Sequence, residues 1–141
     1  MQLFIDGAAR GNPGEAGIGV VLLDQTGSEV LRYCHYLGHP FTNNQAEYNA
    51  LLHALDLARA HGKELLVHSD SELLVKQMQG AYRVKHPDLQ PLYQQAQQKL
   101  KNFTQVTFAH VRREKNQIAD QLANQAIDEK LTNHEMPGVQ P

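Results

Sequence analysis

Residues 2–14 read QLFIDGAARGNPG, and this stretch sets the topology of the chain. The apolar run QLFID predicts a short β-strand over residues 2–6 that stops at a glycine-rich turn. Two more strand patterns follow, GIGVVLLD at 17–24 and EVLRYCHYL at 29–37, and the four residues QTGS at 25–28 between them are typical of a hairpin turn. Three strands joined by such short connections predict an antiparallel meander.

The apolar residues change to a helical period after residue 43. One helical face over residues 44–61 is marked by Ala46, Ala50, Leu51, Ala54, Leu55 and Ala58. Strands are predicted for ELLVHS at 64–69 and TQVTFAHV at 104–111, helices for 71–78 and about 88–101, and a last helix is expected to begin at its cap, Asn116. This order predicts an α/β fold with a mixed five-stranded sheet, three antiparallel strands followed by two parallel ones, flanked by helices.

The length and composition of the chain limit its class. With 141 residues, 41% of them hydrophobic and 20% charged, the chain is expected to form one globular domain over residues 1–130, followed by a loosely held tail at 131–141. No apolar run reaches the roughly 18 residues that a membrane span requires, so we expect no membrane association. The single cysteine, Cys34, excludes an internal disulfide and favours a reducing, cytoplasmic location, where we expect a monomer.

Four acidic residues lie in four different local patterns. Asp6 and Asp70 each follow a predicted strand, and Glu47 and Asp120 each lie near the start of a predicted helix. An α/β sheet collects its functional side chains at the edge where such elements meet. Carboxylates held close together repel one another, so the cluster is expected to persist only with divalent cations. The pattern predicts a two-metal site for phosphodiester hydrolysis.

Each acid also has a local structural explanation. Asp6 fits a turn and Asp70 fits a helix cap. Glu47 stands three residues after Asn44, which is the spacing of a capping box, and Asp120 complements a helix dipole. None of these devices explains why all four acids fall at the ends of central elements, or why a polar set accompanies them. That set is Asn12, Thr42, Asn43, Asn44 and Ser71.

Four motifs closely resemble those of the ribonuclease HI family: FIDGAARGNPG at 4–14, TNNQAEYNAL at 42–51, HSDSELLVKQM at 68–78 and REKNQIADQLA at 113–123. They occur in the family's order, and the resemblance covers roughly residues 1–128, most closely that of the compact archaeal-type branch. It implies a ribonuclease H-like fold and an endonuclease that hydrolyses the RNA strand of RNA–DNA hybrids, leaving 5′-phosphate and 3′-hydroxyl ends. The implied cofactor is Mg²⁺, with Mn²⁺ able to substitute, and two ions are implied when substrate is bound.

The resemblance also implies roles for individual residues. By motif position, the metal-binding and catalytic carboxylates are Asp6, Glu47, Asp70 and Asp120. Contacts to the hybrid are implied for Asn12, Asn43 and Asn44, and we add Ser71 to them. Whether an RNA–RNA duplex is also a substrate is left open by the sequence.

The chain departs from many family members in two places. Where those members insert a basic helix and loop, MQGAYRVKHPDLQPL at 78–92 leads almost directly to the next helix, so substrate grip is expected from Arg83, Lys85 and Arg112. The flexible loop that carries a catalytic histidine in many members is replaced by RREK at 112–115. We expect Arg113 rather than His110 to act in its place, because arginine stays protonated and His110 belongs to the strand pattern.

Three other functions fit the same residues less well. A catalytically silent binding module on this fold would be expected to lack an acid, and all four are present. A 3′–5′ exonuclease would carry a second acid two residues after Asp6, where this chain has Ala8. The nuclease domain of a reverse transcriptase would be expected to accompany a polymerase.

The net charge of −2 turns slightly positive once the four acids are counted as metal ligands, which is compatible with a nucleic-acid substrate.

Overall fold

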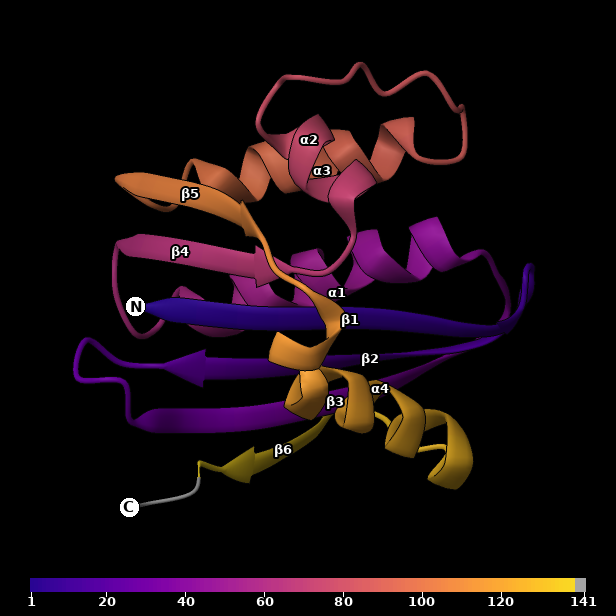
Figure 1. Cartoon of the computed structure of the whole chain (residues 1–141), viewed down its shortest axis with the longest axis horizontal. Helices are drawn as coiled ribbons and strands as arrows, with labels where there is room; N and C mark the ends of the chain where they lie inside the picture. Colours follow the sequence, from indigo (N-terminus) through magenta and orange to yellow (C-terminus); the bar gives the residue numbers. More distant parts are fainter. Residues whose placement is uncertain (139–141) are drawn as a thin grey trace.

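The computed structural model describes residues 1–138 as one mixed sheet with helices on both faces (Figure 1). The strands are β1 (Gln2–Gly11), β2 (Gly14–Leu23), β3 (Glu29–Phe41), β4 (Glu64–Ser69), β5 (Gln105–His110) and β6 (His134–Pro137). The helices are α1 (Asn43–Ala58), α2 (Glu72–Met78), α3 (Gln90–Leu100) and α4 (Gln117–Glu129), and a short 3₁₀ turn at Arg113–Lys115 precedes α4. The predicted α/β fold and its order of elements are confirmed.

The strands lie in the order β5-β4-β1-β2-β3-β6. β1, β2 and β3 form the predicted antiparallel meander, and β4 and β5 run parallel to β1. The sixth strand differs from the expected five: β6 pairs antiparallel with β3, from His134 opposite Cys34 to Pro137 opposite Leu31. Its sequence has few apolar residues, but the edge of β3 offers unpaired backbone groups, and pairing with them does not require apolar side chains. Residues 139–141, the end of the predicted tail, lie outside the described residues.

The two faces of the sheet pack against different helices. Leu3, Ile5 and Val20 lie in the main core on the face that α1 covers. On the other face, α4 crosses β1, β2 and β3. A Cβ on Gly19 would come within 2.1 Å of the Ala119 carbonyl oxygen, so glycine at this position permits the close approach of α4 to β2.

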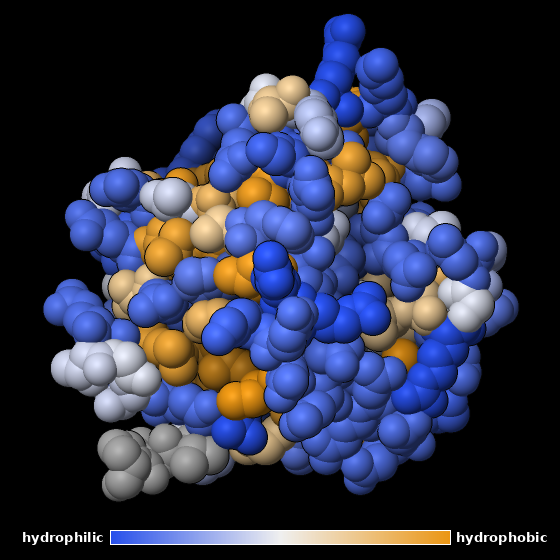
Figure 2. Space-filling view, in the orientation of Figure 1, coloured by the Kyte–Doolittle hydropathy of each residue, from blue (hydrophilic) through white to orange (hydrophobic). Residues whose placement is uncertain are grey.

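α4 covers only part of its face of the sheet. Figure 2 shows apolar side chains at the surface on this side of the molecule. A hollow of about 470 Å³ between the start of α4 and the neighbouring strands is lined in part by Phe4, Val21, Leu23 and Ile118. Within residues 1–138, no helix combines the length and the apolar character needed to cross a membrane.

Local hydrogen bonds set the starts of α1 and α2. Thr42 caps α1 in a reciprocal pair, because the Gln45 amide donates to Thr42 Oγ1 at 3.1 Å and the Thr42 amide donates to Gln45 Oε1 at 2.8 Å. The hydroxyl of Ser71 caps α2. The capping explanations for Glu47 and Asp70 are therefore wrong, and both carboxylates are free for another role.

The predicted capping role of Asn116 is also wrong. Asn116 occupies the N-cap position of α4, but its side chain makes no capping hydrogen bond. Its Nδ2 atom donates instead to the Ile5 carbonyl oxygen, at 2.8 Å. The side chain therefore joins the start of α4 to β1.

Polar contacts hold the segment between α4 and β6 against α1 and β3. The Asn133 amide donates to His35 Nδ1 at 2.8 Å, and the Tyr33 hydroxyl donates to Asn133 Oδ1 at 2.8 Å. Because the Tyr33 proton is used there, His53 Nδ1–H donates to the Tyr33 oxygen, at 2.9 Å. The rings of His35 and His53 stack with their centroids 4.8 Å apart. Burial, and then the neighbouring His35, lowers the pKa of His53 to about 4.

The depressed pKa of His53 predicts a loss of stability in mild acid. As the pH falls from 6.5 to about 4, the unfolded chain protonates this histidine while the folded chain does not, so the free energy of unfolding decreases. His53→Gln should remove about 1–2 kcal/mol of that decrease, allowing for partial exposure of the ring. Urea unfolding of the wild type and of His53→Gln, at neutral pH and in mild acid, measures the decrease in the free energy of unfolding of each protein. The exposed His61 provides a control, since His61→Gln should follow the wild type, and equal pH dependence of His53→Gln and wild type would contradict the prediction.

Candidate active site

The site forms where β1 continues past the end of β4. β1 pairs with β4 only over residues 2–5, whereas its pairing with β2 extends over residues 2–11. Beyond the last β4 pair, backbone groups on this side of β1 need other partners. The Gly7 N–H donates to Glu47 Oε1 at 3.1 Å, so a carboxylate from α1 takes the place of the missing strand.

α1 lies close to β1 at this point. A Cβ on Gly7 would lie 2.3 Å from a backbone carbon of α1, so glycine at this position allows the approach that brings Glu47 over the strand. Further along β1, the Ala9 N–H donates to Asn43 Oδ1 at 3.1 Å. The Asn43 N–H in turn donates to Asn12 Oδ1 at 3.1 Å. Asparagine side chains therefore connect β1, the β1–β2 turn and the start of α1.

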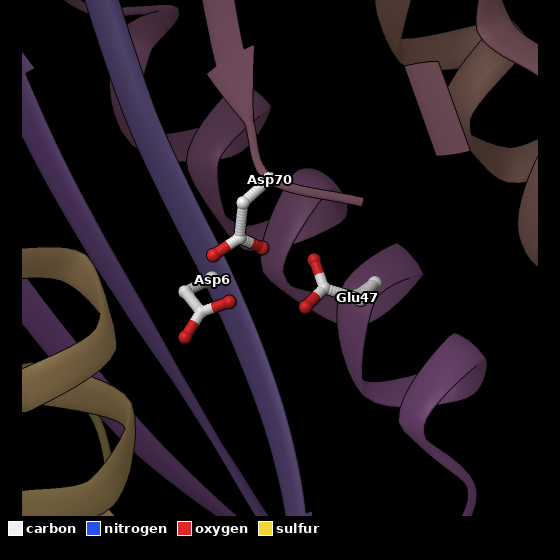
Figure 3. Close-up of side chains that lie close together, drawn as sticks. All are labelled: Asp6, Glu47 and Asp70. Carbon is white, nitrogen blue, oxygen red and sulfur yellow. The ribbon is translucent and has the colours of Figure 1, made fainter. Parts of the chain in front are cut away.

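Three carboxylates from three elements converge beside β1 (Figure 3). Asp6 comes from β1, Glu47 from α1, and Asp70 directly follows β4. One ligand atom from each lies within 4.8 Å of the other two. Asp6 and Glu47 are buried, and Asp70 is half-buried.

Burial and mutual repulsion disfavour the charged forms of these carboxyls. Burial raises the pKa of Asp6, and the charges of Glu47 and Asp70 raise it further. Burial also raises the pKa of Glu47, although hydrogen bonds from Asp6 and from the Gly7 amide oppose that shift. The cluster therefore favours an arrangement with positive charge, from a proton or a metal ion, among its carboxyl groups.

The donor set fits a divalent cation. Glu47 Oε2 is buried and has no hydrogen-bond partner within residues 1–138, while Oε1 is held by the Gly7 amide. A buried carboxylate oxygen without a partner is costly, and coordination to a hard cation satisfies it. Asp6, Glu47 and Asp70 thus form an acidic metal-binding triad.

A cavity of about 340 Å³ opens beside the triad. Its lining brings together most of the residues that the sequence analysis selected: Asp6, Asn43, Asn44, Glu47, Asp70, Ser71, Arg113 and Asp120. Asp120, from the first turn of α4, lies on the wall outside the group of three, but its side chain is close enough to Asp6 to raise the pKa of that carboxyl further. Asn12 does not line the cavity and is connected to it through Asn43.

The remaining sequence candidates lie away from the triad. His110 is exposed at the end of β5 and does not line the cavity. Arg83 lines a separate hollow in the connection between α2 and α3, next to the exposed Tyr82. Lys85 belongs to the same connection, and Arg112 is exposed after β5. The sequence predicts Asn116 only as a cap, because nothing in its motif indicates that its partner is in β1.

Comparison with known proteins decides the family. A family model described as reverse transcriptase-like matches residues 4–126. The crystal structure of LC11-RNase H1 in complex with RNA/DNA hybrid superposes with a TM-score of 0.86 and 43% identity, covering 93% of this chain and 99% of that one. The chain belongs to the ribonuclease H1 family. The family that the four motifs resemble is thereby confirmed.

Two curated relatives of this ribonuclease H1 family member are longer than the chain. Ribonuclease HI of Halobacterium salinarum is 41% identical over 130 residues, which are 92% of this chain and 65% of the relative. Bifunctional protein Rv2228c of Mycobacterium tuberculosis is 45% identical over 124 residues, which are 87% of this chain and 34% of the relative. The chain thus spans about two thirds of the first and about one third of the second.

Removing one carboxylate from the triad should have opposite effects with and without metal. In EDTA, Asp70→Asn relieves the repulsion on Asp6 and Glu47, so its melting temperature should exceed that of the wild type by ~2 °C or more. With Mg²⁺ or Mn²⁺, the variant should lose most of the metal-induced rise in melting temperature, because one ligand is neutral. Thermal unfolding in each condition measures both effects. Asp88→Asn removes an exposed carboxylate elsewhere and should behave as the wild type; a full metal-induced rise in Asp70→Asn would contradict the assignment.

Proposed function

We propose that this protein is an endoribonuclease that hydrolyses the RNA strand of RNA–DNA hybrids. The observation that carries the proposal is the triad of Asp6, Glu47 and Asp70, whose ligand atoms lie within 4.8 Å of one another beside a cavity with amide side chains on its wall. Membership of the ribonuclease H1 family supports the reaction class, and the hybrid bound to LC11-RNase H1 supports the substrate. The products would carry 5′-phosphate and 3′-hydroxyl ends.

The cofactor in this proposal is Mg²⁺, with Mn²⁺ able to substitute and two ions present with substrate. The residues that would hold the ions are Asp6, Glu47, Asp70 and Asp120. Divalent cations at such a site supply activation of a water and stabilisation of the leaving oxygen. The chain itself fixes the carboxylates, because the Gly7 amide holds Glu47 while β1 fixes the backbone of Asp6.

Arg113 supplies positive charge at the cavity. It is exposed on the wall, and its charge lowers the pKa of Glu47, which supports its proximity to the carboxylates. A guanidinium can contact two phosphate oxygens at once and does not give up its proton, so Arg113 would bind the scissile phosphate electrostatically. His110 has no part in this step.

The asparagine side chains would recognise the RNA strand. The oxygens of the Asn12 and Asn43 amides accept backbone N–H groups of the protein. Their Nδ2 atoms, and the whole amide of Asn44, have no hydrogen-bond partner in the described chain. Such donors can meet the 2′-hydroxyl groups that distinguish RNA from DNA. Ser71, which also lines the cavity, would add a contact while it caps α2.

The rest of the duplex would be held by basic side chains outside the cavity. Arg83, Lys85 and Arg112 are the candidates for phosphate contacts, which are sequence-independent and sensitive to salt. We place the ribonuclease H domain at residues 1–130, with residues 131–138 joined to its sheet through β6 rather than loosely held, in a cytoplasmic monomer. The buried, free thiol of Cys34 suits a reducing compartment.

The proposal is tested with end-labelled RNA–DNA hybrid, RNA–RNA and DNA–DNA duplexes, each with Mg²⁺ and with EDTA. We expect Mg²⁺-dependent cleavage within the RNA strand of the hybrid, and a loss of orders of magnitude in Asp70→Asn but not in Asp88→Asn. Cleavage of the RNA–RNA duplex would widen the substrate class. Binding of the hybrid without cleavage, by wild-type protein in Mg²⁺ or Mn²⁺, would replace the nuclease with a binding module.

Arginine and histidine variants separate the two candidates for the phosphate contact. Arg113→Ala should lower kcat by ~10-fold or more, corresponding to ~1.4 kcal/mol or more in the barrier. His110→Ala should change kcat little, because His110 does not reach the cavity. Steady-state kinetics over a range of pH measure the kcat of both variants. The opposite ranking, with a histidine-like titration that disappears in His110→Ala, would show that His110 is the catalytic group.

Asn44 offers the cleanest test of RNA recognition. It is exposed and its side chain makes no hydrogen bond within residues 1–138, so Asn44→Ala should leave the melting temperature within about 1 °C of the wild type. The KM for the hybrid should rise several-fold through the lost donor. Asn102→Ala, at a turn that does not line the cavity, is the matched control. Unchanged kinetics in Asn44→Ala would remove this residue from the substrate contacts.

A further inference from the structure

Two of the site residues lie in or just after the connection from β5 to α4, which crosses the end of β4 (Figure 1). Arg113 lies in its 3₁₀ turn, and Asp120 lies in the first turn of α4. Both line the cavity, on the opposite side from α1. Their positions relative to Asp6 therefore depend on how this connection is fixed to the sheet.

The connection is attached to the sheet at two points. At the first, the Val111 N–H donates to the Ser69 carbonyl oxygen at 2.9 Å, at the end of β4. At the second, Asn116 Nδ2 donates to the Ile5 carbonyl oxygen at 2.8 Å, one residue before Asp6. Residues 112–115 between them are all exposed. The second attachment is thus the point that sets the distance between the connection and β1.

The Asn116 side chain serves this attachment alone within the described residues. It is only 2% exposed, and its Oδ1 atom is buried without a hydrogen-bond partner. It does not cap α4. A leucine has the same branched shape and the same number of heavy side-chain atoms, and it would leave no unsatisfied acceptor, which is unfavourable when buried. The hydrogen bond to the Ile5 carbonyl oxygen therefore explains why position 116 carries a side-chain amide.

The backbone of Asn116 extends the attachment to both site residues. The Asn116 N–H donates to the Arg113 carbonyl oxygen at 2.9 Å, closing the 3₁₀ turn. The Asp120 N–H donates to the Asn116 carbonyl oxygen at 3.1 Å, forming the first turn of α4. A shift of Asn116 away from β1 would move both turns with it.

We propose that Asn116 is a positioning residue of the active site, whose hydrogen bond to the Ile5 carbonyl holds Arg113 and Asp120 in place relative to Asp6. The inference rests on the proposed nuclease function. It assigns Asn116 no contact with substrate. Because misplacement of catalytic groups by about 1 Å can cost ~100-fold in rate, a single buried bond can control turnover.

The experiment compares Asn116→Ala with Leu31→Ala. Leu31 is buried in β3 opposite Leu22, at the other end of the sheet, so its variant loses stability without touching the connection. Assayed well below both melting temperatures, Asn116→Ala should lower kcat by ~10-fold or more while the KM for the hybrid stays within about twofold. The rise in melting temperature on adding Mn²⁺ should also shrink, because Asp120 is displaced. Leu31→Ala should show neither change.

A second variant covers the case in which Asn116→Ala does not fold. Asn116→Ser keeps a short donor and should give the same pattern more weakly. The test variant is Asn116→Ala, or Asn116→Ser if the alanine variant does not fold. If its kcat and its Mn²⁺-induced rise in melting temperature equal those of Leu31→Ala, Asn116 is only structural and the inference is overturned. Wild-type protein that cleaves no hybrid would instead overturn the proposed function, and the Mn²⁺-induced rise would still decide the role of Asn116.

Discussion

The structure depends on a difference in length between two parallel strands. β4 ends at Ser69, and β1 continues beyond it. Backbone groups on that side of β1 then need partners from elsewhere in the chain. The partners are side chains from the two helices on opposite faces, Glu47 and Asn43 from α1 and Asn116 from the start of α4. Satisfying the backbone of one strand therefore also brings the walls of the active site together.

This arrangement buries the carboxylates of Asp6 and Glu47. Glu47 approaches β1 because its carboxylate replaces a strand partner, and Asp6 already lies in that strand. Burial raises the pKa of both carboxyls, and Asp70 adds repulsion at the end of β4. A divalent cation removes the repulsion and satisfies the free oxygen of Glu47, so metal binding and folding stability are linked in this molecule.

The sequence motifs predicted much of the fold and site because they are local. Strand and helix periods gave the order of elements, and the strand at 64–69 was predicted with its observed bounds. The acids were found because each stands where the sequence predicted that an element ends or begins, although Asp6 in fact lies within β1, which continues to Gly11 instead of turning after residue 6. The capping box was assigned to the wrong residues, since Thr42 and Gln45 have the same three-residue spacing as Asn44 and Glu47, and α1 begins directly after Thr42. The sixth strand was missed because its pairing comes from the free edge of β3, not from its own apolar pattern.

By itself, the sequence determined the fold class, the family resemblance and the identity of the acidic residues, because these follow from patterns within short segments. Only the tertiary structure decided which side chain completes which backbone group. Asn116 and Ile5 are far apart in the chain, and no local pattern relates them, yet they meet because the connection from β5 crosses the end of β4. The same long-range packing decided that Asp6, Glu47 and Asp70 share one cluster and that Asp120 adjoins it beside Asp6, since their positions depend on how α4 and α1 pack on opposite faces of the sheet.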